Sequence, residues 1–188
     1  MNEAPDDGPR EVESKYRLDG PAAHEALRAR LVALGARRGA VEQERNLLFD
    51  QPDGSLRAAD RVLRLRVLDG GPAGRLTYKG PADYAAAVKS RTELEIAVDD
   101  CQIACALLEA LGYAPSLEYP KERETWYLEG AEVALDVLPF GTYCEIEGPR
   151  AVIARLATAL GLPDAAAEPA GYPTLMARHL RTGHAAGP

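Results

Sequence analysis

The chain has 188 residues, 46% hydrophobic and 27% charged, and we expect one domain over residues 10–181 between frayed tails at 1–9 and 182–188. The formal net charge of −7 argues against nonspecific binding to nucleic acid or to an anionic membrane, because either would need an exposed basic field. The N-terminal residues lack an apolar signal-peptide region, and there is no run of about eighteen apolar residues that could span a bilayer, so we expect a cytoplasmic protein.

Strands dominate the elements that the sequence predicts. Clear turn and helix signals separate them, such as Pro21 at a helix start and Gly35 at its end. In chain order we expect a strand at 11–18, a helix at 21–34, a strand at 44–50, a loop at 52–60, strands at 61–69, 74–80 and 88–98, a helix at 99–112, strands at 121–128, 132–138 and 142–148, a helix at 150–160, a loop at 162–171 and a helix at 173–181.

Most of the predicted strands have one charged face and one apolar face. Because successive strand side chains point to opposite sides, residues two apart share a face. In the first strand Glu11, Glu13 and Lys15 share one face, whereas Val12 and Tyr16 take the other. The same alternation places further charged residues together on one face: Arg64 with Arg66, Arg75 with Lys79, Lys89 with Arg91, Glu93 with Glu95, Lys121 with Arg123, and Glu145 with Glu147.

A sheet with one solvated face would also alternate charged and apolar residues, so a charged β-sandwich without a ligand is one interpretation. The repeated Arg and Lys pairs and the acidic pairs favour another, in which eight strands close into a barrel and the helices cover its apolar outside. Buried cations in the lumen would be costly without carboxylates or an anionic ligand. A polyphosphate with divalent cations fits, because Arg and Lys donate to phosphate oxygens and clustered carboxylates bind Mg²⁺ or Mn²⁺.

The charged segments also follow one another in a family-like order. Residues 11–15 have the form ExExK. They are followed, in this order, by the segments LRLR, LTYKG, SRTELEI, YPKERE, LDVLPFG and YCEIEG. Over residues 11–148 this series resembles the CYTH, or triphosphate tunnel metalloenzyme, superfamily of class IV adenylate cyclases, thiamine triphosphatases and inorganic triphosphatases. The resemblance implies an α+β, mainly β fold: a closed antiparallel eight-stranded barrel with flanking helices.

The resemblance also implies roles for the charged residues. The metal-holding end, for Mg²⁺ or Mn²⁺, would consist of Glu11, Glu13, Asp136, Glu145 and Glu147. The candidate catalytic residues are the cations that would also bind the triphosphate: Lys15, Arg64, Arg66, Lys79, Lys121 and Arg123. Arg91 is expected to bind substrate as well, in a network with Glu93 and Glu95.

These assignments leave the reaction open. Water attacking a phosphorus atom would make the chain a triphosphatase for tripolyphosphate or thiamine triphosphate, which is our leading hypothesis. Attack of the ribose 3′-hydroxyl on the α-phosphorus of ATP would make it an adenylate cyclase that releases pyrophosphate. A noncatalytic module that binds polyphosphate or a nucleotide is a third possibility. We expect a monomer or homodimer with a small-molecule triphosphate as its partner.

A few residues are expected to stand outside this site. Trp126 alternates away from Lys121 and Arg123, which predicts a place beneath a helix. His24, His179 and His184 are expected at the surface. The cysteines, Cys101, Cys105 and Cys144, form no CxxC pair and are expected to be reduced structural thiols.

Overall fold

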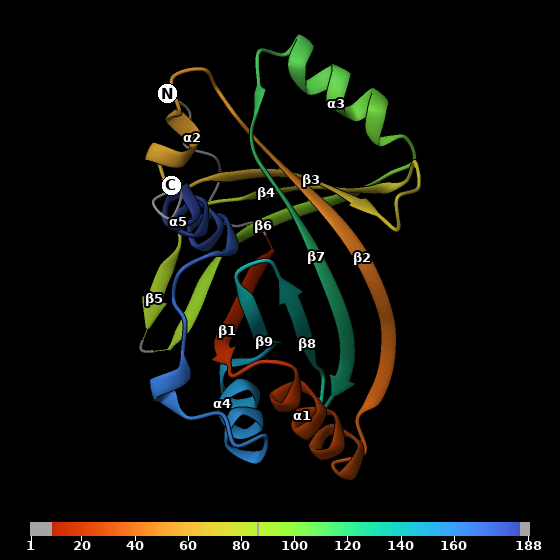
Figure 1. Ribbon diagram of the computed structural model, residues 1–188, viewed down its shortest axis with the longest axis vertical. Coiled ribbons are helices and arrows are strands. Elements are labelled where there is room, and N and C mark those ends of the chain that lie inside the picture. The colour runs from red at the N-terminus through yellow and green to blue at the C-terminus, as the bar shows by residue number, and fades with distance from the viewer. Residues whose placement is uncertain (1–8, 86, 185–188) are drawn as a thin grey trace.

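The computed structural model describes residues 9–85 and 87–184, the last two by their backbone only. Within this part of the chain, one antiparallel sheet has the strand order β1-β9-β8-β7-β2-β3-β4-β6-β5 (Figure 1). The strands are β1 (Arg10–Leu18), β2 (Arg37–Asp50), β3 (Val62–Leu68), β4 (Gly74–Lys79), β5 (Asp83–Ala85), β6 (Val88–Val98), β7 (Ala114–Leu128), β8 (Ala131–Leu138) and β9 (Gly141–Glu147).

A pairing between β1 and β6 closes eight of these strands into a barrel. Its register runs from Arg10 opposite Thr92 to Glu13 opposite Lys89, and β5 adds to the far edge of β6 as an extra strand. The predicted closed antiparallel barrel of eight strands is therefore confirmed.

The helices lie outside the barrel, as the apolar strand faces predicted. In Figure 1, α1 and α4 lie together at one end of the barrel and α3 lies at the other. Leu31 of α1 and Ile153 of α4 belong to one buried cluster with Val133 and Leu135 of β8. The helices are α1 (Pro21–Ala33), α2 (Ser55–Ala58), α3 (Cys101–Ala110), α4 (Arg150–Ala159) and α5 (Tyr172–His184), with a 3-10 turn, η1 (Asp164–Ala166).

Several element boundaries differ from those that the sequence predicted. β2 begins at Arg37 rather than 44, and β7 begins at Ala114 rather than 121; the two strands pair with each other along most of this extra length. Their long ladder gives the polar stretch 37–43 strand structure that its weak alternation does not predict. The short elements α2, β5 and η1 were not expected either, and α5 continues to His184. The rest of the two expected tails, residues 1–8 and 185–188, lies outside the described residues.

The residues expected outside the site are mostly placed as predicted. Trp126 is buried with Leu27 and Leu31 of α1, which confirms its position beneath a helix. The surface prediction is wrong for His24, which is 3% exposed and has its Nε2 atom 3.0 Å from the carbonyl oxygen of Tyr143. His179 is exposed, and the side chain of His184 lies outside the described residues. None of the described helices is both long and apolar enough to cross a membrane.

Candidate active site

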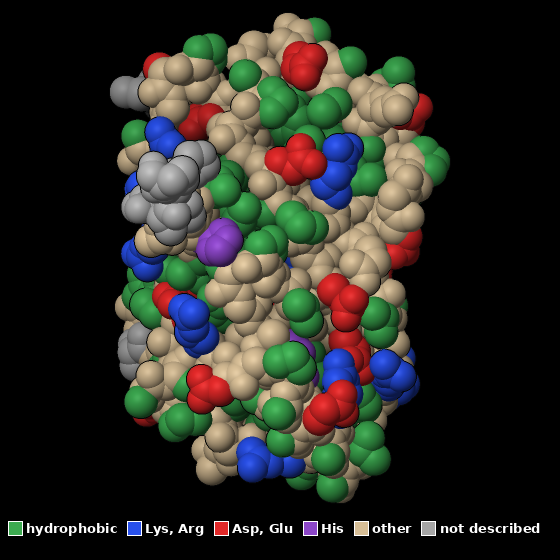
Figure 2. Space-filling view, viewed as in Figure 1, with side chains coloured by type: hydrophobic (Ala, Val, Ile, Leu, Met, Phe, Trp, Pro, Cys, Tyr) green, Lys and Arg blue, Asp and Glu red, His purple; other side chains and the backbone are tan. Residues whose placement is uncertain are grey.

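A cavity of about 460 Å³ occupies the lumen of the barrel, and most of its lining is charged. By contrast, the outer face in Figure 2 carries charged side chains of both signs scattered among apolar ones. The lining includes Glu11, Glu13, Lys15, Arg64, Arg66, Lys79, Lys89, Arg91, Glu93, Glu95, Lys121, Arg123, Glu145 and Glu147. The charged strand faces thus point inward, as the alternation predicted.

One part of this lumen, which we call the basic section, is built around Glu44. Its carboxylate lies 3.0 Å from Lys121 Nζ and 3.5 Å from Arg66 Nε, and the residue is 3% exposed. Burial alone would raise the pKa of Glu44, but the charges of Lys121 and Arg66 outweigh it and lower the pKa to about 2. Burial, together with Arg123, lowers the pKa of Lys121 to about 8. Burial and the neighbouring Arg64 likewise lower the pKa of Arg66 to about 10. Burial is the largest cause of both lowered cation pKa values, and the neighbouring cations add to it.

A second ion-pair network joins Arg123 to two carboxylates. Its guanidinium donates to both oxygens of Asp136, at 2.8 and 2.6 Å, and also to Glu145. The hydroxyl of Tyr172 donates to Asp136 at 2.7 Å. The ring of Tyr172 lies 4.2 Å from Lys15 Nζ, so the first residue of α5 reaches into the cation-lined lumen.

Several guanidinium N–H groups in the lumen lack a hydrogen-bond acceptor. Among the described residues, the Nε atoms of Arg64, Arg66 and Arg91 are buried and make no hydrogen bond. Within the described part of the chain, Arg64 has Thr77 as its one hydrogen-bond partner, at 3.3 Å, and Glu95 as a distant ion-pair partner at 3.9 Å. Two of these atoms face a carboxylate without forming a hydrogen bond: Arg66 Nε lies 3.5 Å from Glu44, and Arg91 Nε lies 3.5 Å from Glu11. Buried donors without hydrogen bonds are costly, and an anion in the lumen would complete them.

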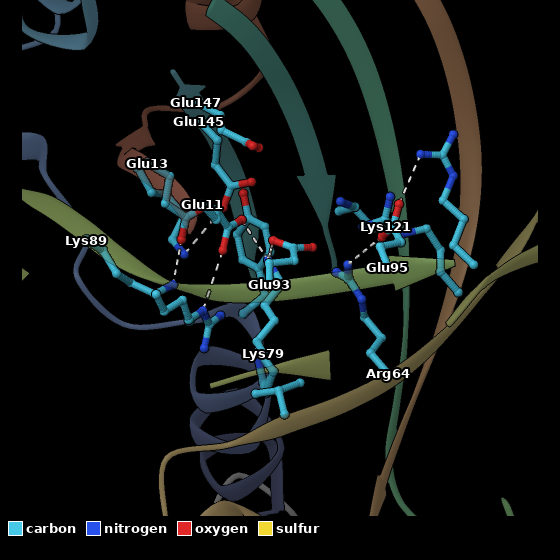
Figure 3. Close-up of a pocket in the computed structure, with 18 of the residues that line it drawn as sticks. Glu11, Glu13, Arg64, Lys79, Lys89, Glu93, Glu95, Lys121, Glu145 and Glu147 are labelled. Atoms are coloured by element: carbon cyan, nitrogen blue, oxygen red, sulfur yellow. Dashed lines mark hydrogen bonds and ion pairs between the residues drawn. The ribbon is translucent and has the colours of Figure 1, made fainter. Parts of the chain in front are cut away.

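At the other end of the cavity the acidic residues gather, and we call this part the acidic end. In Figure 3 Glu11, Glu13, Glu145 and Glu147 lie together, apart from Arg64 and Lys121. Glu11 bonds Lys79 at 2.7 Å, and Glu13 bonds Lys89 at 2.5 Å, whereas Glu147 makes no ion pair with any described residue. Burial raises the pKa of Glu147 to about 7, and the carboxylates of Glu11 and Glu93 add to the shift. Glu147 is exposed as a residue, so the crowding of carboxylates around it is the main physical cause of this shift in its pKa.

The acidic end fits a divalent cation by its chemistry. Its donors are carboxylate oxygens, the ligands that Mg²⁺ and Mn²⁺ prefer. The Oε2 atom of Glu11 is buried without a hydrogen bond and has Arg91 Nε as an ion-pair partner at 3.5 Å. Glu147 stands directly opposite Glu13 in the β1–β9 ladder. Across the described residues, however, no three His, Cys, Asp or Glu side chains are grouped as a preformed metal site. Glu11 and Glu13 are instead bound to lysines, so a metal ion would have to compete with Lys79 and Lys89 for them.

The structure brings nearly all of the sequence-predicted site residues to this one cavity. The predicted cations all line it, and so do the predicted metal ligands except Asp136, which is fully buried behind Arg123. Sequence reasoning did not assign site roles to Lys89, although its place on the charged face was a usable signal. It also missed Glu44, Tyr119 and Tyr172, for which local sequence offered no comparable signal.

Comparison with known proteins agrees with this geometry. The CYTH domain model matches residues 9–159. The chain belongs to the CYTH domain family. Adenylate cyclase CyaB of Aeromonas hydrophila is 30% identical to this CYTH protein over 183 residues, which cover 90% of each chain.

Solved structures share the fold of this CYTH domain. A putative adenylate cyclase from Vibrio parahaemolyticus superposes with a TM-score of 0.76 at 23% identity, covering 90% of this chain and 99% of the other. The putative adenylyl cyclase HpAC1 from Hippeastrum gives a TM-score of 0.73 at 23% identity, covering 90% and 96%. At these identities the likeness establishes the common tunnel architecture.

Proposed function

We propose that this CYTH protein is a divalent-metal-dependent enzyme that acts on triphosphates, and that its main reaction is triphosphate hydrolysis. The observation that carries the proposal is the set of buried guanidinium Nε–H groups that make no hydrogen bond, those of Arg64, Arg66 and Arg91, in a cavity that also gathers carboxylates. A chain of three phosphates offers two things that this cavity lacks. Its oxygens are acceptors for the cations, and they also help to bind a metal ion.

Binding would exchange the partners of the lumenal ion pairs. Without substrate, Arg123 is held by Asp136 and Glu145, and Lys79 by Glu11 and Glu93. Phosphate oxygens would bind the cations in place of the carboxylates, and the carboxylates would then be free to bind a metal ion. The cost of separating each buried pair is then offset because both partners gain a new one.

Each group of residues then has its own task in the reaction. Arg64, Arg66 and Lys121 would fix the phosphate oxygens and neutralise the charge that develops on them, without any covalent step on the protein. Lys15, Lys79, Arg91 and Arg123 would hold the same chain from other walls of the lumen. A divalent ion would supply Lewis-acid neutralisation, held by Glu11, Glu13, Glu145 and Glu147, with Asp136 behind them.

A second candidate reaction is the cyclisation of ATP. It is favoured by one observation, the 30% identity to a protein named adenylate cyclase CyaB. A relative's name does not decide the matter, because the Hippeastrum protein, called a putative adenylyl cyclase, has a dominant triphosphatase activity. A noncatalytic polyphosphate-binding module is disfavoured, since a pure anion binder gains nothing from the acidic end.

The deciding experiment identifies the products. The pure protein is incubated separately with tripolyphosphate, thiamine triphosphate and ATP, each with Mg²⁺, Mn²⁺ or EDTA. We expect phosphate release from at least one non-nucleotide triphosphate, dependent on metal. The Arg64→Ala variant, prepared in parallel, reports any contaminating phosphatase. Conversion of ATP to cyclic AMP and pyrophosphate with tripolyphosphate left intact would establish the cyclase instead, and full turnover in EDTA would refute the metal requirement.

A further inference from the structure

The first residue of α5, Tyr172, lies in the wall of the tunnel between Gly171 and Pro173, which line it as well. Tyr172 is 7% exposed, and its hydroxyl donates to the Oδ2 atom of Asp136 at 2.7 Å. Asp136 is itself 0% exposed. A neutral hydroxyl from α5 is therefore bonded to the most deeply buried carboxylate of the candidate active site.

Aromatic neighbours hold the ring of Tyr172 in place. The ring packs edge-on against that of Tyr143, with the centroids 5.3 Å apart, and lies 6.2 Å from the ring of Phe140. Its face lies 4.2 Å from Lys15 Nζ. Because packing on several sides fixes the ring, the hydroxyl keeps its place at Asp136 when the other partners of that carboxylate move.

The other partners of Asp136 are cations. Arg123 donates to its Oδ1 atom at 2.8 Å and to its Oδ2 atom at 2.6 Å, and Lys121 Nζ lies 3.8 Å from Oδ1. Arg123 and Lys121 both line the tunnel, where a triphosphate would attract them. Tyr172 carries no charge, so it has no comparable attraction to the phosphates.

This difference matters when substrate binds. Transfer of Arg123 to a phosphate oxygen removes two of the hydrogen bonds that Asp136 accepts. A buried carboxylate that loses its partner is costly, and this cost would oppose substrate binding. The bond from Tyr172 reduces the cost, because it stays with Asp136 after Arg123 has left.

We propose that Tyr172 is a positioning residue for triphosphate binding: its hydroxyl holds Asp136 in place while Arg123 passes from Asp136 to the phosphates. Tyr172 acts through Asp136 and Arg123 and makes no contact with the substrate in this role. The inference rests on the proposed function, because the transfer of Arg123 is part of it.

The test removes one hydroxyl at a time. Tyr143→Phe is the matched control for Tyr172→Phe, since Tyr143 is fully buried in the same aromatic cluster and its hydroxyl makes no hydrogen bond to any described residue. Affinity for tripolyphosphate is measured by calorimetry in EDTA. We expect Tyr172→Phe to weaken binding by about tenfold and Tyr143→Phe by less than about twofold. Equal affinities of the two variants would overturn the inference.

A double-mutant cycle separates positioning from a merely structural role. In an Arg123→Ala background no guanidinium can leave Asp136, so Tyr172→Phe should change the affinity for tripolyphosphate by less than about twofold. A tenfold loss that persists there would show that Tyr172 acts independently of Arg123, and the inference would be wrong. Asp136→Asn is a second background with the same expected result, used if thermal unfolding shows that Arg123→Ala does not fold.

The wild-type protein distinguishes failure of this inference from failure of the proposed function. If the wild type binds tripolyphosphate but Tyr172→Phe binds it as tightly, Tyr172 has no positioning role and the proposed function stands. If the wild type does not bind tripolyphosphate, the proposed function fails and the inference fails with it.

Discussion

The basic section and the acidic end of the tunnel are built from the same residue types, but a lysine has the shifted pKa that stands out at one end and a glutamate at the other. In the basic section, burial and neighbouring cations lower the pKa of Lys121 to about 8, while the carboxylate of Glu44 is held ionised. At the acidic end, burial and neighbouring carboxylates raise the pKa of Glu147 to about 7. At both ends neighbouring groups of the same charge add to the effect of burial, cations beside Lys121 and carboxylates beside Glu147, so the two ends should respond differently to substitution.

The largest effect is expected for Glu44→Gln in the basic section. The change leaves Lys121 and Arg66 buried without their carboxylate, and should lower the free energy of unfolding by about 3 kcal/mol. Urea unfolding at pH 7 measures it. Glu118→Gln, at an exposed position of β7, is the control and should change stability by less than about 0.5 kcal/mol. Equal stability of the two variants would show that the basic section does not depend on Glu44.

At the acidic end, Glu147→Gln should have the reverse profile. Turnover of triphosphate with Mg²⁺ or Mn²⁺ should fall by about 100-fold, because the change removes a proposed metal ligand, whereas stability without metal should not decrease. Steady-state kinetics and thermal unfolding in EDTA give the two readouts, again beside Glu118→Gln. Retention of wild-type turnover would remove Glu147 from the metal site.

Arg64→Ala and Arg66→Ala should weaken tripolyphosphate binding by about tenfold each, with little loss of stability. Each change removes a buried guanidinium that makes no hydrogen bond through its Nε atom. Calorimetric titration provides the affinities, and Arg45→Ala, which removes an exposed cation paired with Glu118, serves as the control. Should both variants bind as the wild type does, these cations would not contact the triphosphate.

Acid should reveal the smallest effect. The folded-state pKa of Glu44, about 2, lies below its ordinary value of 4.5, so its contribution to stability is present above pH 4.5 and is lost as the pH falls towards 2. Between pH 6 and pH 3.5 the wild type should lose about 1.4 kcal/mol more than Glu44→Gln does. Urea unfolding at both pH values tests this, and parallel losses in the two proteins would contradict the lowered pKa.

The sequence was most informative where a strand has one charged and one apolar face. Arg64 and Arg66 alternate with Leu63, Leu65 and Val67. The two-residue periodicity of a strand was therefore enough to assign both arginines to the same face of the sheet. The whole barrel and most of its lining followed from repeating that step along the chain. The family resemblance then supplied the roles of the carboxylates.

Contacts between distant elements could not be predicted in this way. Glu44 lies near the middle of β2, in a strand whose first half has no clear apolar alternation, and its partner Lys121 comes from β7. Tyr172 starts a helix that looked like an ordinary surface element, and only the folded chain brings its hydroxyl to Asp136.

The closure of the barrel through β1 also has a kinetic consequence. β1 is the first strand of the sheet, but its partners, β6 and β9, are made much later in the chain. Such nonlocal pairing is slow because the intervening chain must be ordered before the contact forms. Glu11 and Glu13 therefore take their places late in folding, and a nascent chain that has not yet released β9 from the ribosome cannot complete the acidic end.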